Sequence, residues 1–195
     1  AFAEAAHAFE PGSWEKQQQP ILTHGPAAWD LGAIHEHDLV RHSNGTYVLF
    51  YTGGCGGDCG CPGNFCDQGG LATSTDLRSW AKYKQGNPVL SYSKIRDRFD
   101  AKHRRPRSLS RIGEYWYLQY EGGSHSEVIG HNCSSIDSVG LARSKEIEGP
   151  WVEFHPLQLS IPQQPGPSMS SVWTGWPRCT TDDLDPGSLF CFYAA

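Results

Sequence analysis

An internal repeat constrains the fold of this chain more than any other feature of its sequence. The segment 44–53, NGTYVLFYTG, resembles 112–122, IGEYWYLQYEG, with Tyr47 aligned on Tyr115. A shorter version, GSLFCFYAA, returns at 187–195. A recurrence at roughly 70 residues predicts a repeat architecture in which each period forms one supersecondary unit.

The flanks of these segments repeat in the same order. The sequence GLATSTDLRSWAKY at 70–83 returns as GLARSKEIEGPWVEF at 140–154. An aromatic residue followed by Asp precedes each unit, as Trp29-Asp30 and as Phe99-Asp100. Several matched blocks at one spacing indicate two complete copies of the same unit.

Each unit is predicted to consist of strands, because runs such as TYVLFYT and YWYLQYE are rich in β-branched and aromatic residues. Asn44-Gly45 lies between two such runs and is typical of a type I′ hairpin turn. We expect four antiparallel strands per unit, at 38–43, 46–53, 69–75 and 79–90, and then at 107–111, 114–121, 138–144 and 150–160.

Four-stranded units of this length predict an all-β fold, a β-propeller. Blade one spans about 38–90 and blade two about 107–160 within a partial propeller at 13–195. A third, broken blade combines 13–22 with 171–195, and 1–12 is an N-terminal arm. The ring is therefore incomplete. Either the sequence is part of a longer chain, or a partner or self-association covers the open edge.

Composition limits the partners. The net charge of −5 over 195 residues argues against nucleic acid. No apolar run approaches the ~20 residues that span a bilayer.

The cysteines indicate a compartment. Four of the seven cysteines lie close together, and their spacing matches no standard zinc motif. We therefore expect local disulfides in preference to a thiolate metal site, among Cys55, Cys59, Cys61 and Cys66. Disulfides and two glycosylation sequons, at Asn44 and Asn132, favour a secreted or otherwise extracytoplasmic or lumenal protein.

The repeated motif, strongest as GLARSKEIEGPW at 140–151, resembles the five-bladed propeller glycoside hydrolases of families 43, 32 and their relatives. The resemblance implies a sugar pocket on one face of the ring. That face holds the connections that lead into the first strand of each unit and those between its second and third strands. It also implies an Asp at the start of the first strand in blades one and two and a Glu in the third blade. Hydrolysis needs one carboxylic acid and one carboxylate.

In blade one, the segment 35–40, HEHDLV, occupies the position of the family's Asp-Pro motif. Glu36 then stands in place of the Asp, His37 replaces the Pro, and Asp38 lies nearby. Glu36 could serve as a base with a longer reach. The alternative is a solvated acidic residue in a loop.

In blade two, Arg105 stands where the second Asp belongs, before Pro106. An Arg stays protonated and accepts no hydrogen bond, so it cannot replace that Asp. It could bind a carboxylate or sulfate on an acidic sugar, or it could pair with Glu36 or Asp38. In the broken blade, 173–178 holds no acid. Two of the three expected carboxylates are therefore missing.

Histidines and tryptophans supply the other candidates for the same face. His37 and His103 are candidate sugar contacts. With His35, His125 and His131 they could hold a metal ion, although ordinary loop histidines explain them better and no cofactor is expected. Sugar-stacking candidates, which core packing could also explain, are Trp29, Trp173 and Trp176.

Three functions remain open from the sequence. The first is a glycosidase-like module that binds carbohydrate or a protein partner without standard hydrolytic competence. The second is an active glycoside hydrolase that uses Glu36 as base. The third is a structural subunit of a larger extracytoplasmic or lumenal assembly. A fold does not carry a function with it, so the site must decide.

Overall fold

The computed structural model describes most of the chain, and it is all-β. The described residues are 3–5, 14–54, 66–93, 95, 98–125, 135–153, 175–182 and 185–194. Some of them are described by their backbone alone, including Glu36, His125 and all of the last two strands except Ser188. Within these ranges, no helix is long and apolar enough to cross a bilayer.

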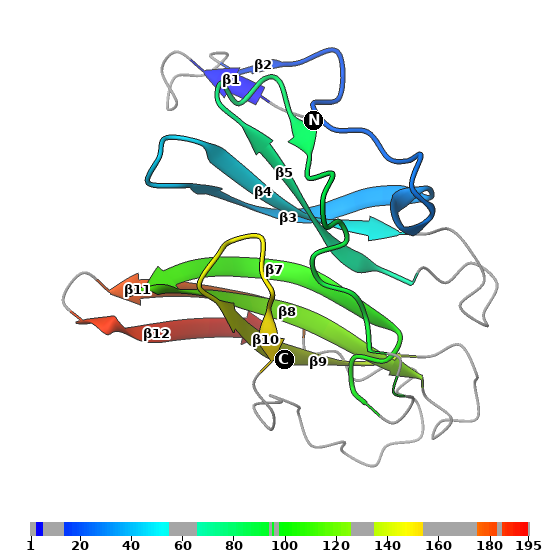
Figure 1. Cartoon of the computed structure of the whole chain (residues 1–195), viewed down its shortest axis with the longest axis vertical. Helices are drawn as coiled ribbons and strands as arrows, with labels where there is room; N and C mark the ends of the chain where they lie inside the picture. Colours follow the sequence, from blue (N-terminus) through cyan, green and yellow to red (C-terminus); the bar gives the residue numbers. More distant parts are fainter. Residues whose placement is uncertain are drawn as a thin grey trace.

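Two four-stranded antiparallel sheets form the body of the molecule (Figure 1). Blade one has the order β3-β4-β5-β6, and blade two has the order β7-β8-β9-β10. Their bounds are β3 (Ala33–Arg41), β4 (Tyr47–Gly54), β5 (Gln68–Ser74), β6 (Ala81–Lys82), β7 (His103–Ile112), β8 (Tyr115–His125), β9 (Ser135–Ser144) and β10 (Val152–Glu153). The predicted four-stranded units are confirmed.

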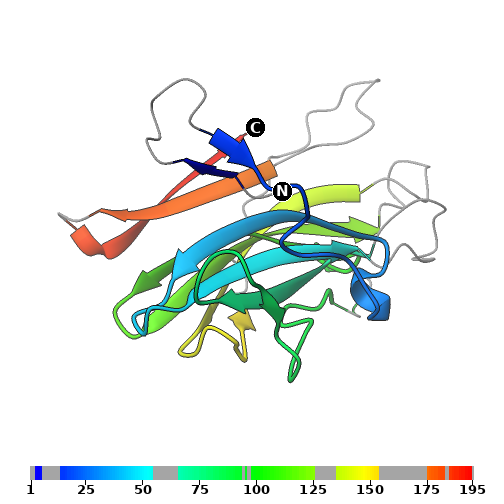
Figure 2. The same cartoon turned by 90° about the horizontal axis from the view of Figure 1, so that it is seen from above.

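Two further sheets have two strands each (Figure 2). One pairs β1 (Ala3–Ala5) with β2 (Trp14–Lys16), and the other pairs β11 (Gly175–Asp182) with β12 (Asp185–Ala194). The pairing of 13–22 with the C-terminal strands is not among the described ladders, and the predicted domain boundaries stay a prediction.

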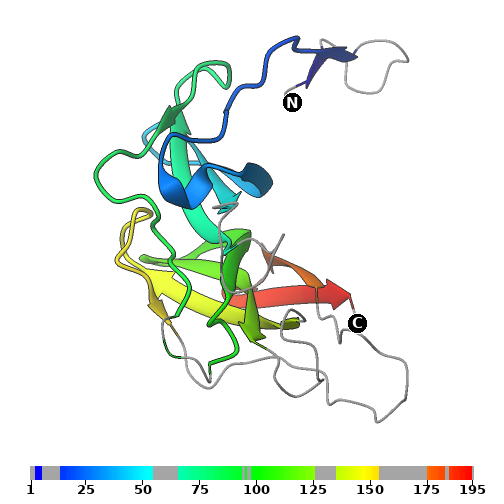
Figure 3. The same ribbon diagram turned by 90° about the vertical axis from the view of Figure 1, so that its right-hand side faces the viewer.

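The inner strands of successive sheets lie next to each other, as they do around the axis of a propeller. Strand β7 contacts β3 of blade one and also β11, so that the sheets follow one another as layers (Figure 3). The only helical turn in the described ranges is the short 3-10 helix η1 (Ala28–Asp30), which precedes blade one. The sheets do not close into a ring, and the fold is therefore an incomplete β-propeller.

The observed strand bounds differ from the predicted ones at both edges of each blade. The inner strands begin earlier than predicted, because 33–37 continues the ladder to 51–54 across a bulge, and 103–106 does the same in blade two. The outer strand β6 is much shorter than predicted, since it pairs with β5 over only two residues. The predicted fourth strand of blade two, 150–160, is described only up to Glu153, where β10 pairs with β9 over two residues.

The predicted equivalence of Tyr47 and Tyr115 is wrong by one residue. Tyr47 pairs with Arg41 across the hairpin of blade one, and Trp116 pairs with Arg111 in blade two. In each pair the arginine Cζ lies over the aromatic ring, 5.6 Å from the ring centroid in blade one and 5.4 Å in blade two. The structural equivalent of Tyr47 in blade two is therefore Trp116. The shift arises because the turn 42–46 is longer than the turn 113–114.

The first hairpin turn also differs from the prediction. Gly45 has a φ of +88°, but among the described non-glycine residues only Leu77 has a positive φ. A type I′ turn requires positive φ at both central positions, so Asn44-Gly45 does not form one. Instead, the 42–46 turn is closed by hydrogen bonds from the His42 N–H to the Thr46 carbonyl and from the Gly45 N–H to the His42 carbonyl.

The hydrophobic core lies between the two blades. Blade one contributes buried Val48, Phe50 and Leu71, and blade two contributes Leu109, Trp116, Leu118 and Tyr120. The ring of Phe50 also meets Trp151 edge-on at 5.7 Å. Each sheet therefore buries one face against its neighbour, which is the packing that a propeller needs.

A side-chain hydrogen bond adds to this contact at the inner strands. The backbone N–H of Leu109 on β7 donates to Oδ2 of Asp38 on β3, at 2.7 Å. Asp38 thus has a structural role between the blades. Leu109 is buried, so its N–H would lose its acceptor if the carboxylate were removed.

We expect Asp38→Ala to lower the free energy of unfolding by about 1–3 kcal/mol, because a buried N–H would be left without an acceptor. Asp38→Asn is the matched control, since its amide oxygen can still accept this bond. Urea unfolding of the two variants and the parent chain measures the difference. Equal stability of all three would show that the bond contributes nothing.

Candidate functional site

The candidate site lies where β3 and β7 begin. Both strands contain a register shift there, between His35 and His37 in β3 and between Pro106 and Ser108 in β7. A bulge re-aims the neighbouring side chains. The shift in β3 falls at Glu36, so the candidate base lies at an irregular point of the backbone.

Arg105 is the centre of the described polar contacts. Its Nε donates to Oδ2 of Asp67 at 2.6 Å, and its Nη1 donates to Oε1 of Glu121 at 2.8 Å. Both carboxylates are 0% exposed. Arg107 also contacts Glu121, through Nη2 and Oε2. Charges this deeply buried are tolerated only when they are paired and hydrogen-bonded, and here they are.

The sequence did not indicate these partners of Arg105. The described partners of Arg105 include Asp67 and Glu121, and Asp38 accepts from the Leu109 N–H. The side chain of Glu36 lies outside the description, so the predicted pair of Arg105 with Glu36 stays a prediction. Glu121 faces Arg105 across the ladder, at the position that Thr52 holds opposite His35 in blade one. The sequence therefore contained one sign of this pairing: the second repeat has an acid, Glu121, where the first has Thr52.

Asp67 is held in place by its backbone as well as by its side chain. The N–H of Arg104 donates to the Asp67 carbonyl at 2.9 Å, which ties the start of β7 to the segment before β5. The preceding residue, Cys66, is buried and disulfide-bonded. Cys55, Cys59 and Cys61 lie outside the described residues, so the predicted pairing within this cluster stays a prediction.

The predicted site histidines differ in their exposure to solvent. His35 is partly exposed, with Nε2 3.8 Å from Oδ1 of Asp67, and His37 is exposed. His103 is 1% exposed, with Nε2 3.7 Å from Oε1 of Glu121. A buried His103 cannot touch a sugar in this arrangement, and it instead packs beside the ion pair.

A metal site is not formed by the described side chains, because no group of three or more His, Cys, Asp or Glu residues among them could hold an ion. The loop histidines predicted as a weak alternative are only partly covered. The side chain of His125 and all of His131 lie outside the description.

Trp29 packs inside blade one. Its ring lies 5.6 Å from that of Tyr51, and a Cβ added to Gly70 would come within 2.3 Å of it. These contacts explain the partly buried Trp29 by packing against blade one and give no support to sugar stacking. Trp173 lies outside the described residues, and only the backbone of Trp176, in β11, is described.

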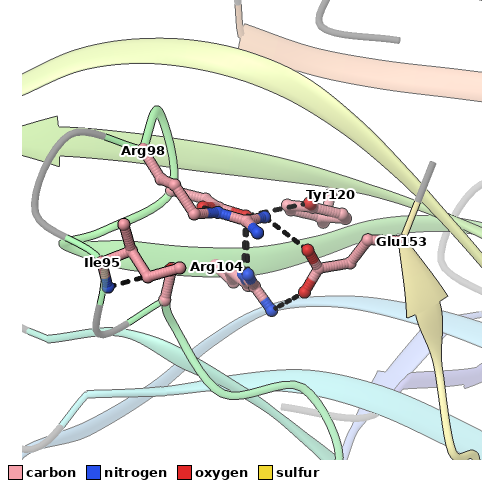
Figure 4. Close-up of polar contacts among 7 residues, drawn as sticks. Ile95, Arg98, Arg104, Tyr120 and Glu153 are labelled. Carbon is pink, nitrogen blue, oxygen red and sulfur yellow. Dashed lines mark hydrogen bonds and ion pairs between the residues drawn. The ribbon is translucent and has the colours of Figure 1, made fainter. Parts of the chain in front are cut away.

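A second buried ion cluster surrounds Asp100 (Figure 4). Arg98 donates to both carboxylate oxygens, at 2.9 and 3.1 Å, and Arg104 donates to Oδ2 at 2.8 Å. Both arginines also pair with Glu153 on the outer strand β10. Tyr120 donates its hydroxyl to Oδ2 at 3.0 Å. The cluster therefore ties the segment before β7 to both edges of blade two.

Blade one has the corresponding acid in a simpler arrangement. Asp30, 1% exposed, pairs directly with Lys82 of β6. Lys82 and Glu153 have equivalent positions, since each pairs with an alanine of its neighbouring strand, Ala72 or Ala142. The repeated Trp29-Asp30 and Phe99-Asp100 motifs thus perform the same structural role in both blades.

The chemistry open to the candidate site is restricted by these pairs. A glycosidic bond is broken with a protonated acid and a second carboxylate that acts on water or on the sugar. Asp67 and Glu121 are buried, and each accepts a hydrogen bond from Arg105. In the described contacts both carboxylates act as acceptors, and Arg105 lies between them, where an acid was expected.

Comparison with known proteins identifies the class of fold. No protein-family model matches the chain, and no curated protein does. Among solved structures, a glycoside hydrolase aligns over 92% of this chain and 47% of its own length, with a TM-score of 0.63 and 20% identity. A thermostable family-43 glycoside hydrolase aligns over 98% of this chain and 55% of its own length, with a TM-score of 0.59 and 18% identity.

A third structure, a Bombyx mori GH32 beta-fructofuranosidase in complex with sucrose, covers 80% of this chain and 28% of its own length, at a TM-score of 0.53 and 23% identity. At these identities the likeness shows the fold alone. The chain has the fold of the propeller glycoside hydrolases, and it spans about half the length of the first two structures.

The Asp100 cluster predicts how stability depends on pH. Burial alone would raise the pKa of Asp100, but the hydrogen bond from Arg98 and the charges of Arg104 and Arg98 outweigh it and hold this pKa below its ordinary value. The stabilisation is therefore complete above the pKa of an unfolded Asp, about 3.9, and is lost as pH falls through the lower, folded value.

We expect the stability difference between the parent chain and Asp100→Asn to be largest near neutral pH and to shrink as the pH falls below the pKa of an unfolded Asp, about 3.9. Tyr120→Phe removes one of the hydrogen bonds to Asp100 and should show a smaller effect of the same sign. Urea unfolding at a series of pH values measures both. A difference that stays constant with pH would contradict the role of the ionised carboxylate.

Proposed function

We propose that this chain is a glycosidase-like propeller module that binds carbohydrate and lacks standard hydrolytic competence. The observation that carries the proposal is the pair of contacts from Arg105 to Asp67 and Glu121. By the resemblance of the sequence motif, this guanidinium stands where the family has a carboxylate. The fold supports the carbohydrate class, since the similar structures are glycoside hydrolases.

The chemistry at the site also favours binding. Arg105 remains 21% exposed while it pairs with two buried acids, and the neighbouring His35 is 33% exposed. A fixed guanidinium and a partly exposed imidazole provide hydrogen-bond donors for sugar hydroxyls or for the carboxylate or sulfate of an acidic sugar. Buried partners keep this donor in one orientation, which lowers the entropic cost of binding.

We place this function outside the cytoplasm, in a secreted or lumenal setting. The support is the cysteine-rich segment and the disulfide-bonded Cys66. Disulfides persist in oxidising compartments and are rare in the cytosol.

We expect the purified chain to bind oligosaccharides in a glycan array or by calorimetry, and to release no sugar from arabinosides, xylosides or fructans. Arg105→Lys keeps the charge but loses the two-pronged geometry, so binding should weaken about tenfold or more. Arg111→Lys, an exposed arginine at the far end of the same strand, is the matched control and should bind as the parent chain does.

Two results would contradict this proposal. Hydrolysis that disappears in Glu36→Gln would identify an active enzyme with Glu36 as base. Absence of both binding and hydrolysis, in a chain shown to be folded, would remove the carbohydrate role.

A second candidate function is that of a subunit that associates through the open face of blade one. Leu39 and Leu109 occupy equivalent positions, since they pair with Leu49 and Leu118. Leu109 is 6% exposed because blade one covers it, whereas Leu39 is 45% exposed. An apolar side chain at a position that is buried in the other repeat marks an interaction surface.

For this second function we expect the chain to self-associate in sedimentation experiments. Leu39→Asp should weaken the association about tenfold or more, because it would bury a charge in the contact. Val152→Asp, at a residue 61% exposed on blade two, is the control and should have no effect. A monomer at all accessible concentrations would rule out self-association through this face.

A further inference from the structure

The turn between β3 and β4 contains a feature that neither the fold nor the sugar site explains. Residues 44–46 read Asn-Gly-Thr, which is the acceptor sequence for N-linked glycosylation. In the structure, the side-chain Oδ1 of Asn44 accepts a hydrogen bond from the backbone N–H of Thr46 at 2.9 Å. The asparagine and the threonine of the motif are therefore held together on one side of the turn.

The acceptor side chain is accessible. Asn44 is exposed, and a Cβ built on Gly45 would meet no atom within 4 Å. Below the turn, the ring of His42 packs against Trp116 of blade two, with their centroids 5.9 Å apart. The motif thus projects from a turn whose base is fixed to the core, with open space around its middle residue.

The turn is also distinct from its repeat and remote from the candidate site. The equivalent turn of blade two, 113–114, is shorter and holds no asparagine. The 42–46 turn and η1 lie at opposite ends of blade one, at the left and right of Figure 1. At about 3.3 Å per residue, β3 separates Arg41 from His35 by roughly 20 Å. A bulky group at Asn44 would leave the Arg105 site open.

We propose that Asn44 is an N-glycosylation site. In this step the side-chain Nδ2 of Asn44 forms an N-glycosidic bond to C1 of an oligosaccharide carried on a lipid diphosphate. The C1–O bond to the diphosphate breaks, the lipid diphosphate leaves, and the amide gives up one proton to the transferring enzyme. The inference rests on the extracytoplasmic location proposed above, and it is independent of whether the Arg105 site binds sugar.

The experiment is expression of the full chain through the secretory pathway of a eukaryotic cell, followed by treatment with peptide N-glycosidase. The chain has one other acceptor sequence, Asn132-Cys-Ser, so the test uses the Asn132→Gln background. We expect one enzyme-sensitive mobility step, and peptide mass spectrometry should show conversion of Asn44 to Asp after glycan removal. A secreted Asn132→Gln chain without that step would overturn the proposal.

Matched variants separate glycosylation from folding. Asn44→Asp keeps the oxygen that accepts the Thr46 N–H but cannot be glycosylated, so it should be secreted without the glycan. Thr46→Ser keeps the motif and should retain the mobility step, whereas Thr46→Ala should lose it. A step that persists in Asn44→Asp or in Thr46→Ala would show that the glycan is elsewhere and would overturn the assignment.

Discussion

The beginning of β7 depends on the neutralisation of two carboxylates that are fully removed from water. Asp67 precedes β5 of blade one, and Glu121 lies in β8 of blade two, so Arg105 joins two blades through one guanidinium. An unpaired charge at either position would cost several kcal/mol, which is of the order of the whole stability of a domain. The chain can therefore bury these acids only if the blades keep their mutual position.

The two blades solve the same packing problem with different charges. In blade one a single Asp30–Lys82 pair joins the entry segment to the outer strand. In blade two the outer position holds Glu153, an acid, so two arginines are needed to join it to Asp100. The aromatic and glycine positions around these acids are retained, with Tyr51 over Gly70 and Tyr120 over Gly140. The two blades therefore share the same backbone arrangement although the charged residues around their buried acids differ.

The sequence predicted the architecture well and the site poorly, for physical reasons. The strand runs and the repeated GLA motif reflect burial of side chains on a sheet. This pattern depends on neighbouring residues in the sequence, so it identified both blades correctly. The alignment of Tyr47 on Tyr115 failed because it ignored the difference between turns 42–46 and 113–114. Arg105 was found from its position in the motif, but its partners come from distant segments, and pairing across blades leaves no local pattern.

A fold shared with glycoside hydrolases does not carry their chemistry with it. A hydrolase of this class needs carboxylates that can change protonation state while they face a sugar. Here Asp67 and Glu121 are buried and accept from arginines, and the partly buried Asp38 accepts the Leu109 N–H. Among the described residues, Asp38 joins β3 to β7, and Arg105 joins Asp67 to Glu121, so the loss of any of these acids would weaken the contact between the blades. The binding role that we propose rests on Arg105 and His35, two partly exposed side chains that buried acids hold in place.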